Sequence, residues 1–128
     1  MSYYLSKMLA VSFDEAVTRA TECLKKEGFG TLTEIDVSAT LKKKINVDFP
    51  NYRILGACNP SLAYEALKLE NKVGTMLPCN VVVREAGNGQ IEVAAIDPVA
   101  SMLAINNPAL KQAAAQVRAK LEKVIADL

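Results

Sequence analysis

The sequence predicts an α+β fold: a two-layer sandwich in which one mixed, mainly antiparallel sheet of about five strands carries helices on one face. Three observations support this fold class. Segments typical of strands and of helices alternate in the first half of the chain. Two runs rich in apolar residues then flank Asn88-Gly89, a pair that favours the tight turn of a β-hairpin. Residues 108–128 finally show a long helical periodicity.

The length and composition of the chain are those of one domain. It has 128 residues, of which 51% are hydrophobic and 23% are charged, and such a composition is typical of a chain with a hydrophobic core. A domain of this size can fold without a metal ion or a disulfide. We therefore expect residues 1–128 to form a single α+β domain.

The first part of the chain predicts a strand followed by a helix. Residues 3–11 are rich in aromatic and aliphatic side chains, as strands are. Ser12 and Glu15 have the spacing of a capping box, which satisfies backbone N–H groups of the first helical turn, and Gly28 ends the helix. The apolar stripe of this helix consists of Phe13, Ala16, Val17, Ala20, Cys23 and Leu24. Cys23 is therefore expected to be a small buried core residue.

The next segments predict two strands around a short helix. Residues 29–37 form the second predicted strand, and residues 38–46 form the helix, with Leu41 and Ile45 facing the core. A turn at Pro50-Asn51 leads into the third strand, over residues 52–57.

Three Asx-Pro pairs mark the later helix starts, because Asn or Asp caps the first turn and proline fits the first helical position. The predicted helices cover residues 59–72, Asp97-Pro98 through Leu103, and Asn107-Pro108 onward. The buried side of helix 59–72 is predicted to consist of Leu62, Ala63, Ala66 and Leu67. The apolar seam of the last helix is predicted to consist of Leu110, Ala114, Val117, Leu121, Val124 and Leu128.

Charge and targeting features argue against several classes of partner. The net charge of +1 does not attract nucleic acid or an anionic membrane, and the run Lys42-Lys43-Lys44 lacks interleaved aromatic side chains that would stack on bases. The N-terminus lacks the pattern of a signal peptide or a spanning helix, and three cysteines, an odd number, suggest reduced thiols. We expect a cytoplasmic protein that binds neither nucleic acid nor a membrane.

The absence of histidine limits the chemistry that the chain can perform. It removes His-based triads, the usual general base near neutral pH, and zinc sites with imidazole ligands. A metal ion would have to bind thiolate, thioether, carboxylate or amide groups. Among the carboxylates, Asp97 is a candidate ligand-binding residue, although capping of the next helix also explains it.

Cys58 and Cys79 form the candidate site. Cys58 ends the third strand just before a helix start, and Cys79 begins the hairpin. If these two strands are antiparallel neighbours, both thiols lie at the same end of the sheet. We expect them to be close enough to share a ligand, but reduced and unbridged. The helix dipole would favour the thiolate of Cys58, the form that attacks or binds metal.

Other side chains could complete this site. Asn59 and Asn80 follow the two cysteines and are predicted to be neighbouring hydrogen-bond donors. Met76 and Met102 could add thioether ligands, and thiolate with thioether suits a soft ion such as Cu(I). The chain has no CxxC motif, however, and methionine is also a common core residue.

Four segments together resemble the domain of unknown function family 302. In chain order they are GFGTLTEIDVSATLKKK, ACNPSLAYEAL, GTMLPCNVVVRE and AAIDPVASM, and the likeness covers nearly the whole chain. The resemblance implies a small α+β domain, usually a homodimer, without an established activity. Both cysteine positions and the Asp-Pro pair match the pattern of the family.

Three hypotheses for the function follow. The domain binds a small thiol-reactive ligand or a soft metal between Cys58 and Cys79. Alternatively, it is a thiol redox enzyme in which Cys58 attacks and Cys79 resolves, or a structural interaction module with inert buried thiols. The expected partner is a second copy of the chain, because an open sheet face and a long helical seam need cover.

Overall fold

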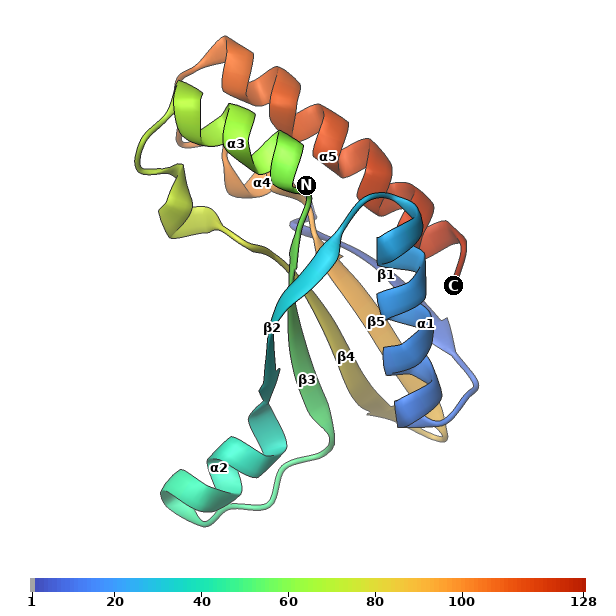
Figure 1. Ribbon diagram of the computed structural model, residues 1–128. Helices are drawn as coiled ribbons and strands as arrows, with labels where there is room; N and C mark the ends of the chain where they lie inside the picture. Colours follow the sequence, from blue (N-terminus) through green and yellow to red (C-terminus); the bar gives the residue numbers. More distant parts are fainter. Residues whose placement is uncertain (1) are drawn as a thin grey trace.

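The computed structural model describes residues 2–128 and has a five-stranded sheet at its centre (Figure 1). The strands are β1 (Tyr4–Leu9), β2 (Gly30–Asp36), β3 (Tyr52–Cys58), β4 (Cys79–Gly87) and β5 (Gln90–Ile96). Their order across the sheet is β1-β5-β4-β3-β2, and each of the four neighbouring pairs is antiparallel. The predicted α+β class and five-stranded sheet are confirmed.

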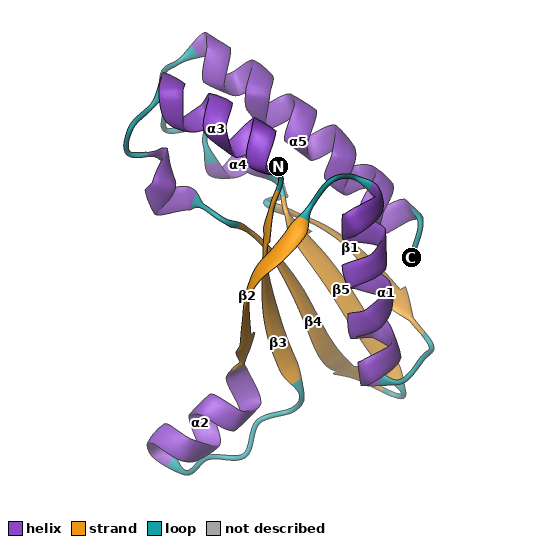
Figure 2. Cartoon of the chain, in the orientation of Figure 1, coloured by secondary structure: helices purple, strands orange, loops and turns teal. Residues whose placement is uncertain are grey.

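The helices occupy three places around the sheet (Figure 2). They are α1 (Phe13–Lys26), α2 (Val37–Ile45), α3 (Pro60–Leu69), α4 (Pro98–Ser101) and α5 (Pro108–Ala126), with a 3-10 helix, η1, at Val73–Met76. Helices α1 and α5 pack against each other and against one face of the sheet. Helices α3 and α4 lie beside the N-terminal half of α5, past one end of the sheet, whereas α2 projects from the opposite end.

The predicted local signals determine where these elements begin and turn. The side chains of Ser12, Asn59, Asp97 and Asn107 each accept a hydrogen bond from a backbone N–H group in the first turn of a helix. Asn88 and Gly89 have φ angles of 54° and 72° and form the hairpin turn between β4 and β5. The predicted hairpin is therefore confirmed.

The hydrophobic core has two parts. The larger part lies between the sheet and the helices α1 and α5, and it includes Leu24, Leu55, Val81, Val93 and Leu121. The smaller part lies beyond the sheet end, among α3, η1, α4 and α5, and consists of Ala66, Val73, Met102, Leu110 and Ala114. Helix α5 contributes to both parts, so its apolar seam is buried within the chain itself.

The packing of α2 was predicted wrongly, and so was that of Leu67 on α3, which is 44% exposed although it was expected on the buried side of its helix. Leu41 is only half-buried, and Ile45 is 63% exposed instead of facing the core. The reason is positional: α2 continues past the end of β2, its main contacts are with β2 and β3, and it projects away from the layer formed by α1 and α5 (Figure 1). Over residues 2–128, no helix combines the length and the apolar character needed to cross a bilayer.

Gly56 lies where β2, β3 and the segment before β4 approach one another. Thr33 pairs with Gly56 across the strands. A Cβ atom on Gly56 would overlap Thr33 Oγ1 and would lie 2.8 Å from Pro78 Cγ. The close packing of these three residues therefore requires glycine at position 56.

We expect the Gly56→Ala variant to be less stable than the wild type by about 1–3 kcal/mol, the usual effect of overpacking a rigid site. Chemical denaturation monitored by circular dichroism measures this change. Gly30→Ala is the matched control, because Gly30 lies in the neighbouring strand and no atom would approach its Cβ within 4 Å. Equal stability of both variants would show that the residues around Gly56 accommodate a methyl group without loss of stability.

Candidate functional site

The structure brings Cys58 and Cys79 to the same end of the sheet. Strands β3 and β4 are antiparallel neighbours in which Ala57 pairs with Cys79, so Cys58 lies one residue further along β3. All three cysteines of the chain are free. Cys23 is a residue of α1 and is buried in the larger core, as predicted. The expected placement of two unbridged thiols at one sheet end is thus found in the structure.

Both thiols line a cavity of about 330 Å³ at the boundary between the two parts of the core. Its walls come from the end of β3, the start of β4 and the helices α3 and α5. The lining residues are Phe29, Leu32, Ala57, Cys58, Asn59, Leu62, Ala63, Ala66, Leu67, Gly74, Leu77, Pro78, Cys79, Pro98, Met102, Leu110, Ala113, Ala114 and Val117. None of these side chains is charged, and most are aliphatic.

Two exposed leucines continue the apolar lining to the protein surface. Leu32 is 66% exposed and Leu67 is 44% exposed, although both line the cavity. Leu32 lies at a β-bulge, where the register between β2 and β3 shifts between Thr31 and Thr33. Bulges change the direction of a side chain relative to the sheet. The cavity therefore has an apolar opening between β2 and α3.

Asn59 is the single amide side chain in the lining, and it already makes two hydrogen bonds to the backbone. Its Oδ1 accepts from the backbone N–H of Leu62 at 3.4 Å, and its Nδ2 donates to the backbone carbonyl of Glu27 at 3.4 Å. The first bond caps α3, and the second fixes the turn after α1. Asn59 is thus a lining residue of the cavity whose side chain also has a structural role.

Asn80 lies on the other face of the sheet from the cavity. Successive residues of a strand point to opposite faces, so Cys79 and Val81 face the helices while Asn80 and Val82 face away. A shallow hollow on the open face includes Asn80 together with Tyr4, Tyr52 and Arg84. The prediction that Asn80 is a hydrogen-bond donor beside the thiols does not fit this position.

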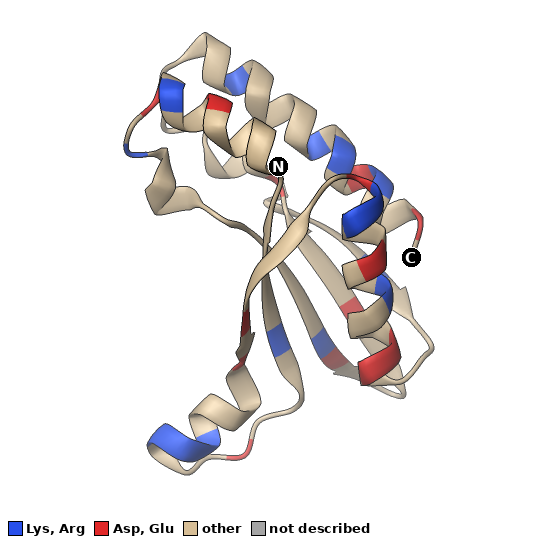
Figure 3. Ribbon diagram, in the orientation of Figure 1, with Lys and Arg blue, Asp and Glu red and all other residues tan. Residues whose placement is uncertain are grey.

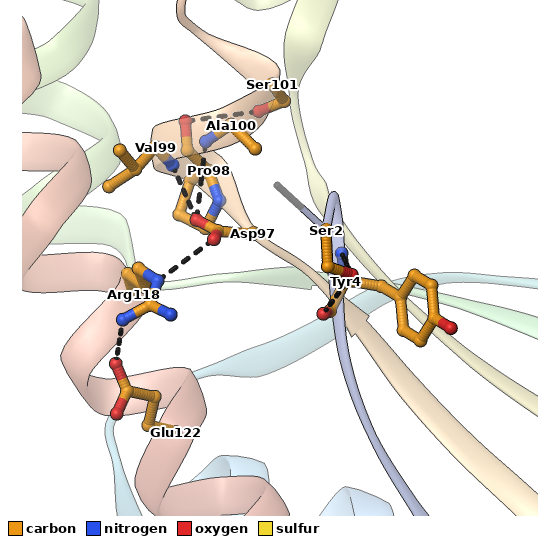
Figure 4. Close-up of polar contacts among 9 residues, drawn as sticks. All are labelled: Ser2, Tyr4, Asp97, Pro98, Val99, Ala100, Ser101, Arg118 and Glu122. Carbon is orange, nitrogen blue, oxygen red and sulfur yellow. Dashed lines mark hydrogen bonds and ion pairs between the residues drawn. The ribbon is translucent and has the colours of Figure 1, made fainter.

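Asp97 also lies outside the cavity and makes structural contacts (Figure 4). Its Oδ1 accepts hydrogen bonds from the backbone N–H groups of Val99 at 2.9 Å and Ala100 at 3.4 Å. Its Oδ2 accepts from Arg118 Nε of α5 at 2.9 Å, and this contact raises the pKa of Arg118. Arg118 in turn pairs with Glu122. The buried carboxylate therefore caps α4 and holds α5.

The two predicted thioether ligands are separated. Met102 is buried and lines the cavity, whereas Met76 is exposed and does not line it. Within residues 2–128, no three His, Cys, Asp or Glu side chains gather where they could hold a metal ion. A metal ion in the cavity would thus depend on Cys58, Cys79 and Met102, three sulfur ligands.

The two thiols differ in burial. Cys79 is 8% exposed, whereas Cys58 is half-buried. Burial raises the pKa of the Cys79 thiol from 9.0 to about 11, because the thiolate loses its hydration, and the nearby Cys58 adds to the shift. Cys79 therefore remains a neutral thiol at physiological pH. Its uncharged form suits the apolar wall around it.

The sequence did not reveal the cavity itself. The lining includes residues that were predicted to pack in the core, among them Leu62, Ala63, Leu110 and Ala114. Their periodicity identifies a buried helix face, but it cannot show that two such faces leave space between them. The exposed position of Leu32 likewise depends on a bulge that no local motif in the sequence marks.

These features define a small α+β domain with an antiparallel sheet, one open sheet face and an apolar, thiol-lined cavity at one end of the sheet. Residues 5–128 match the family described as Domain of unknown function DUF302, so the chain belongs to this family, as its sequence predicted.

A solved structure extends this result to the fold. The crystal structure of the uncharacterized conserved protein DUF302 from Bacillus stearothermophilus is 31% identical to this chain, with a TM-score of 0.92. The similarity covers 99% of this chain and 98% of that chain. None of the curated proteins compared with the chain matches it. The comparisons therefore establish the family and fold without assigning an activity.

The raised pKa of Cys79 predicts a pH-dependent loss of stability. Between pH 9 and about pH 11 the unfolded chain releases this proton while the folded chain retains it, so the free energy of unfolding falls as pH rises. A shift of this size corresponds to a loss on the order of 2 kcal/mol. Below pH 9 the contribution is constant.

Urea denaturation at pH 8 and at pH 11 measures this loss, and the Cys79→Ala variant corrects for other groups that titrate. The free energy of unfolding of the wild type, relative to that of the variant, should be lower at pH 11 than at pH 8. The same difference at both values would contradict the buried, neutral state of Cys79.

Proposed function

We propose that this domain binds a small, uncharged, apolar molecule in the cavity between β3, β4, α3 and α5. The observation that carries the proposal is a cavity of about 330 Å³ whose lining contains two thiols and one amide among apolar side chains. Ligand sites are commonly apolar hollows with a few polar groups, and this volume lies at the small end of their range. A charged ligand would find no charged side chain in the lining to compensate for its lost hydration.

The thiols support a thiol-reactive ligand over a redox cycle. In a redox enzyme, Cys79 would have to attack as a thiolate, and its raised pKa disfavours that form. The same shift weakens a soft-metal site, because binding must displace the Cys79 proton. Inert packing does not by itself account for two thiols beside an open apolar cavity. A reducing compartment such as the cytoplasm would keep both thiols available.

Binding can be tested with N-phenyl-1-naphthylamine, an uncharged apolar dye whose fluorescence rises in apolar surroundings. We expect saturable binding to the wild type. We expect at least about tenfold weaker binding to Ala113→Leu, because the larger side chain fills cavity space and each buried methylene of ligand contributes about 0.8 kcal/mol.

Ala119→Leu is the matched control on the same helix, because Ala119 is exposed and does not line the cavity. It should bind the dye as the wild type does. Thermal denaturation verifies that both variants are folded. No saturable binding to the wild type, or equal binding to both variants, would contradict the proposed site.

We also propose that the chain pairs with a second copy through its open sheet face. Support comes from apolar side chains on that face, where Met8 and Ile35 are exposed and Ile54, Val82 and Ala94 are half-buried. An open sheet face that carries exposed apolar side chains favours association with another protein surface. The seam of α5 no longer supports pairing, because it packs within the chain.

Sedimentation equilibrium at micromolar concentration tests this pairing. The wild type should sediment as a dimer, and Val82→Lys should sediment as a monomer, because a charge would then be buried at the centre of the interface. Thr18→Lys places the same charge on an exposed position of α1, on the opposite side of the sheet, and should remain dimeric. A monomeric wild type would refute the pairing.

A further inference from the structure

We infer that the ligand of this cavity is an apolar electrophile with an activated carbon–carbon double bond, and that Cys58 forms a thioether with it while Cys79 does not react. Apolar α,β-unsaturated carbonyl compounds are the chemical class that fits. This inference rests on the proposed function, because it requires that small apolar molecules enter the cavity.

Accessibility distinguishes Cys58 from the other two cysteines. Cys58 is half-buried and is one of the residues that line the cavity. Cys79 lines the same cavity but is almost fully buried, and it retains its proton near neutral pH. Cys23 lies on the buried side of α1 and does not line the cavity. Cys58 is therefore the most accessible of the three cysteines.

The uncharged lining selects the type of reaction. Disulfide exchange would release a thiolate, and alkylation by a halide would release a halide ion, each into surroundings without a counter-charge. Asp97 and Arg118, which each neighbour a lining residue in the sequence, pair with each other and do not line the cavity. Figure 3 shows the other charged residues along α1, α2, α3 and α5 and on the strands, and none of them is among the lining residues. An addition that releases no ion fits these surroundings best.

Addition of a thiol to an activated double bond meets this condition. Cys58 first loses its proton to water, and the thiolate sulfur bonds to the β-carbon as the carbon–carbon π bond breaks. The electron pair of that bond then takes up a proton at the α-carbon. One S–H and one C=C bond are replaced by one S–C and one C–H bond. No oxidant, reductant or leaving group is required, and the product in the cavity is uncharged.

The apolar opening extends the ligand class to molecules with a longer tail. Leu32 and Leu67 continue the aliphatic surface from the cavity to the outside, between β2 and α3. A ligand longer than the cavity can therefore keep its tail on apolar surface while its reactive end lies near Cys58. This arrangement predicts a preference for uncharged alkyl chains over charged ones of similar length.

Maleimides test the inference, because they react with thiols by the same addition. N-hexylmaleimide is uncharged and apolar, and 6-maleimidohexanoic acid carries a carboxylate on a chain of the same length. We expect N-hexylmaleimide to label Cys58 at least about tenfold faster than the acid, after each rate is divided by its rate with free N-acetylcysteine. Intact mass gives the rates, and peptide mapping gives the labelled residue.

Variants separate the cavity from simple exposure of a thiol. Cys58→Ser should abolish fast labelling, whereas Cys79→Ser and Cys23→Ser should retain it. Ala113→Leu should reduce the preference for the hexyl reagent, and Ala119→Leu should leave it unchanged. Equal normalised rates for the two reagents, or labelling of Cys79 as fast as Cys58 in the folded protein, would overturn the inference.

The dye experiment distinguishes the two possible failures. Saturable, Ala113-sensitive binding of N-phenyl-1-naphthylamine without selective labelling of Cys58 would leave the cavity as a binding site and refute the covalent step. Absence of both dye binding and reagent preference would refute the cavity as a ligand site. Fast, selective labelling of Cys58 that Ala113→Leu does not alter would show reaction at an exposed thiol outside the cavity, and this too would overturn the inference.

Discussion

The contact between Asp97 and Arg118 fixes the position of α5, on which both parts of the core depend. Asp97 lies at the corner where β5 ends and α4 begins, and Arg118 lies in the middle of α5. A buried carboxylate needs partners because an unpaired charge in the interior is strongly unfavourable. With these partners, the C-terminal half of α5 covers the sheet and the N-terminal half extends past its end toward α3. The thiol-lined cavity is the space left at this transition.

Much of the fold could be predicted because its signals are local. The side chains of Asn59, Asp97 and Asn107 each satisfy a backbone N–H group one turn away, and the proline that follows each of them fits only the first turn of a helix. The positive φ angles at Asn88 and Gly89 are likewise a property of those two residues. Such interactions do not depend on distant parts of the chain, so a short segment of sequence is sufficient to identify them.

The candidate site could be predicted only in part, because it depends on tertiary arrangement. Strand pairing alone placed Cys58 and Cys79 at one sheet end, and this was accessible to reasoning about element order. The position of Asn80 followed from strand alternation and could have been found by counting from Cys79. The cavity and the exposure of Ile45 could not be predicted, because an apolar helix face has the same periodicity whether it meets a neighbour, a hollow or solvent.

The apolar surroundings that create the cavity also determine which chemistry its thiols can perform. A pair of cysteines supports a redox cycle only if each can become a thiolate in turn, and thiolates are stabilised by positive charge or by water. The lining provides neither beside Cys79, whose proton is held by burial. Cys58 is half-buried and therefore nearer to the solvent. In the proposed function the two thiols therefore have unequal roles: Cys58 reacts with a bound molecule, and Cys79 contributes uncharged surface to the cavity.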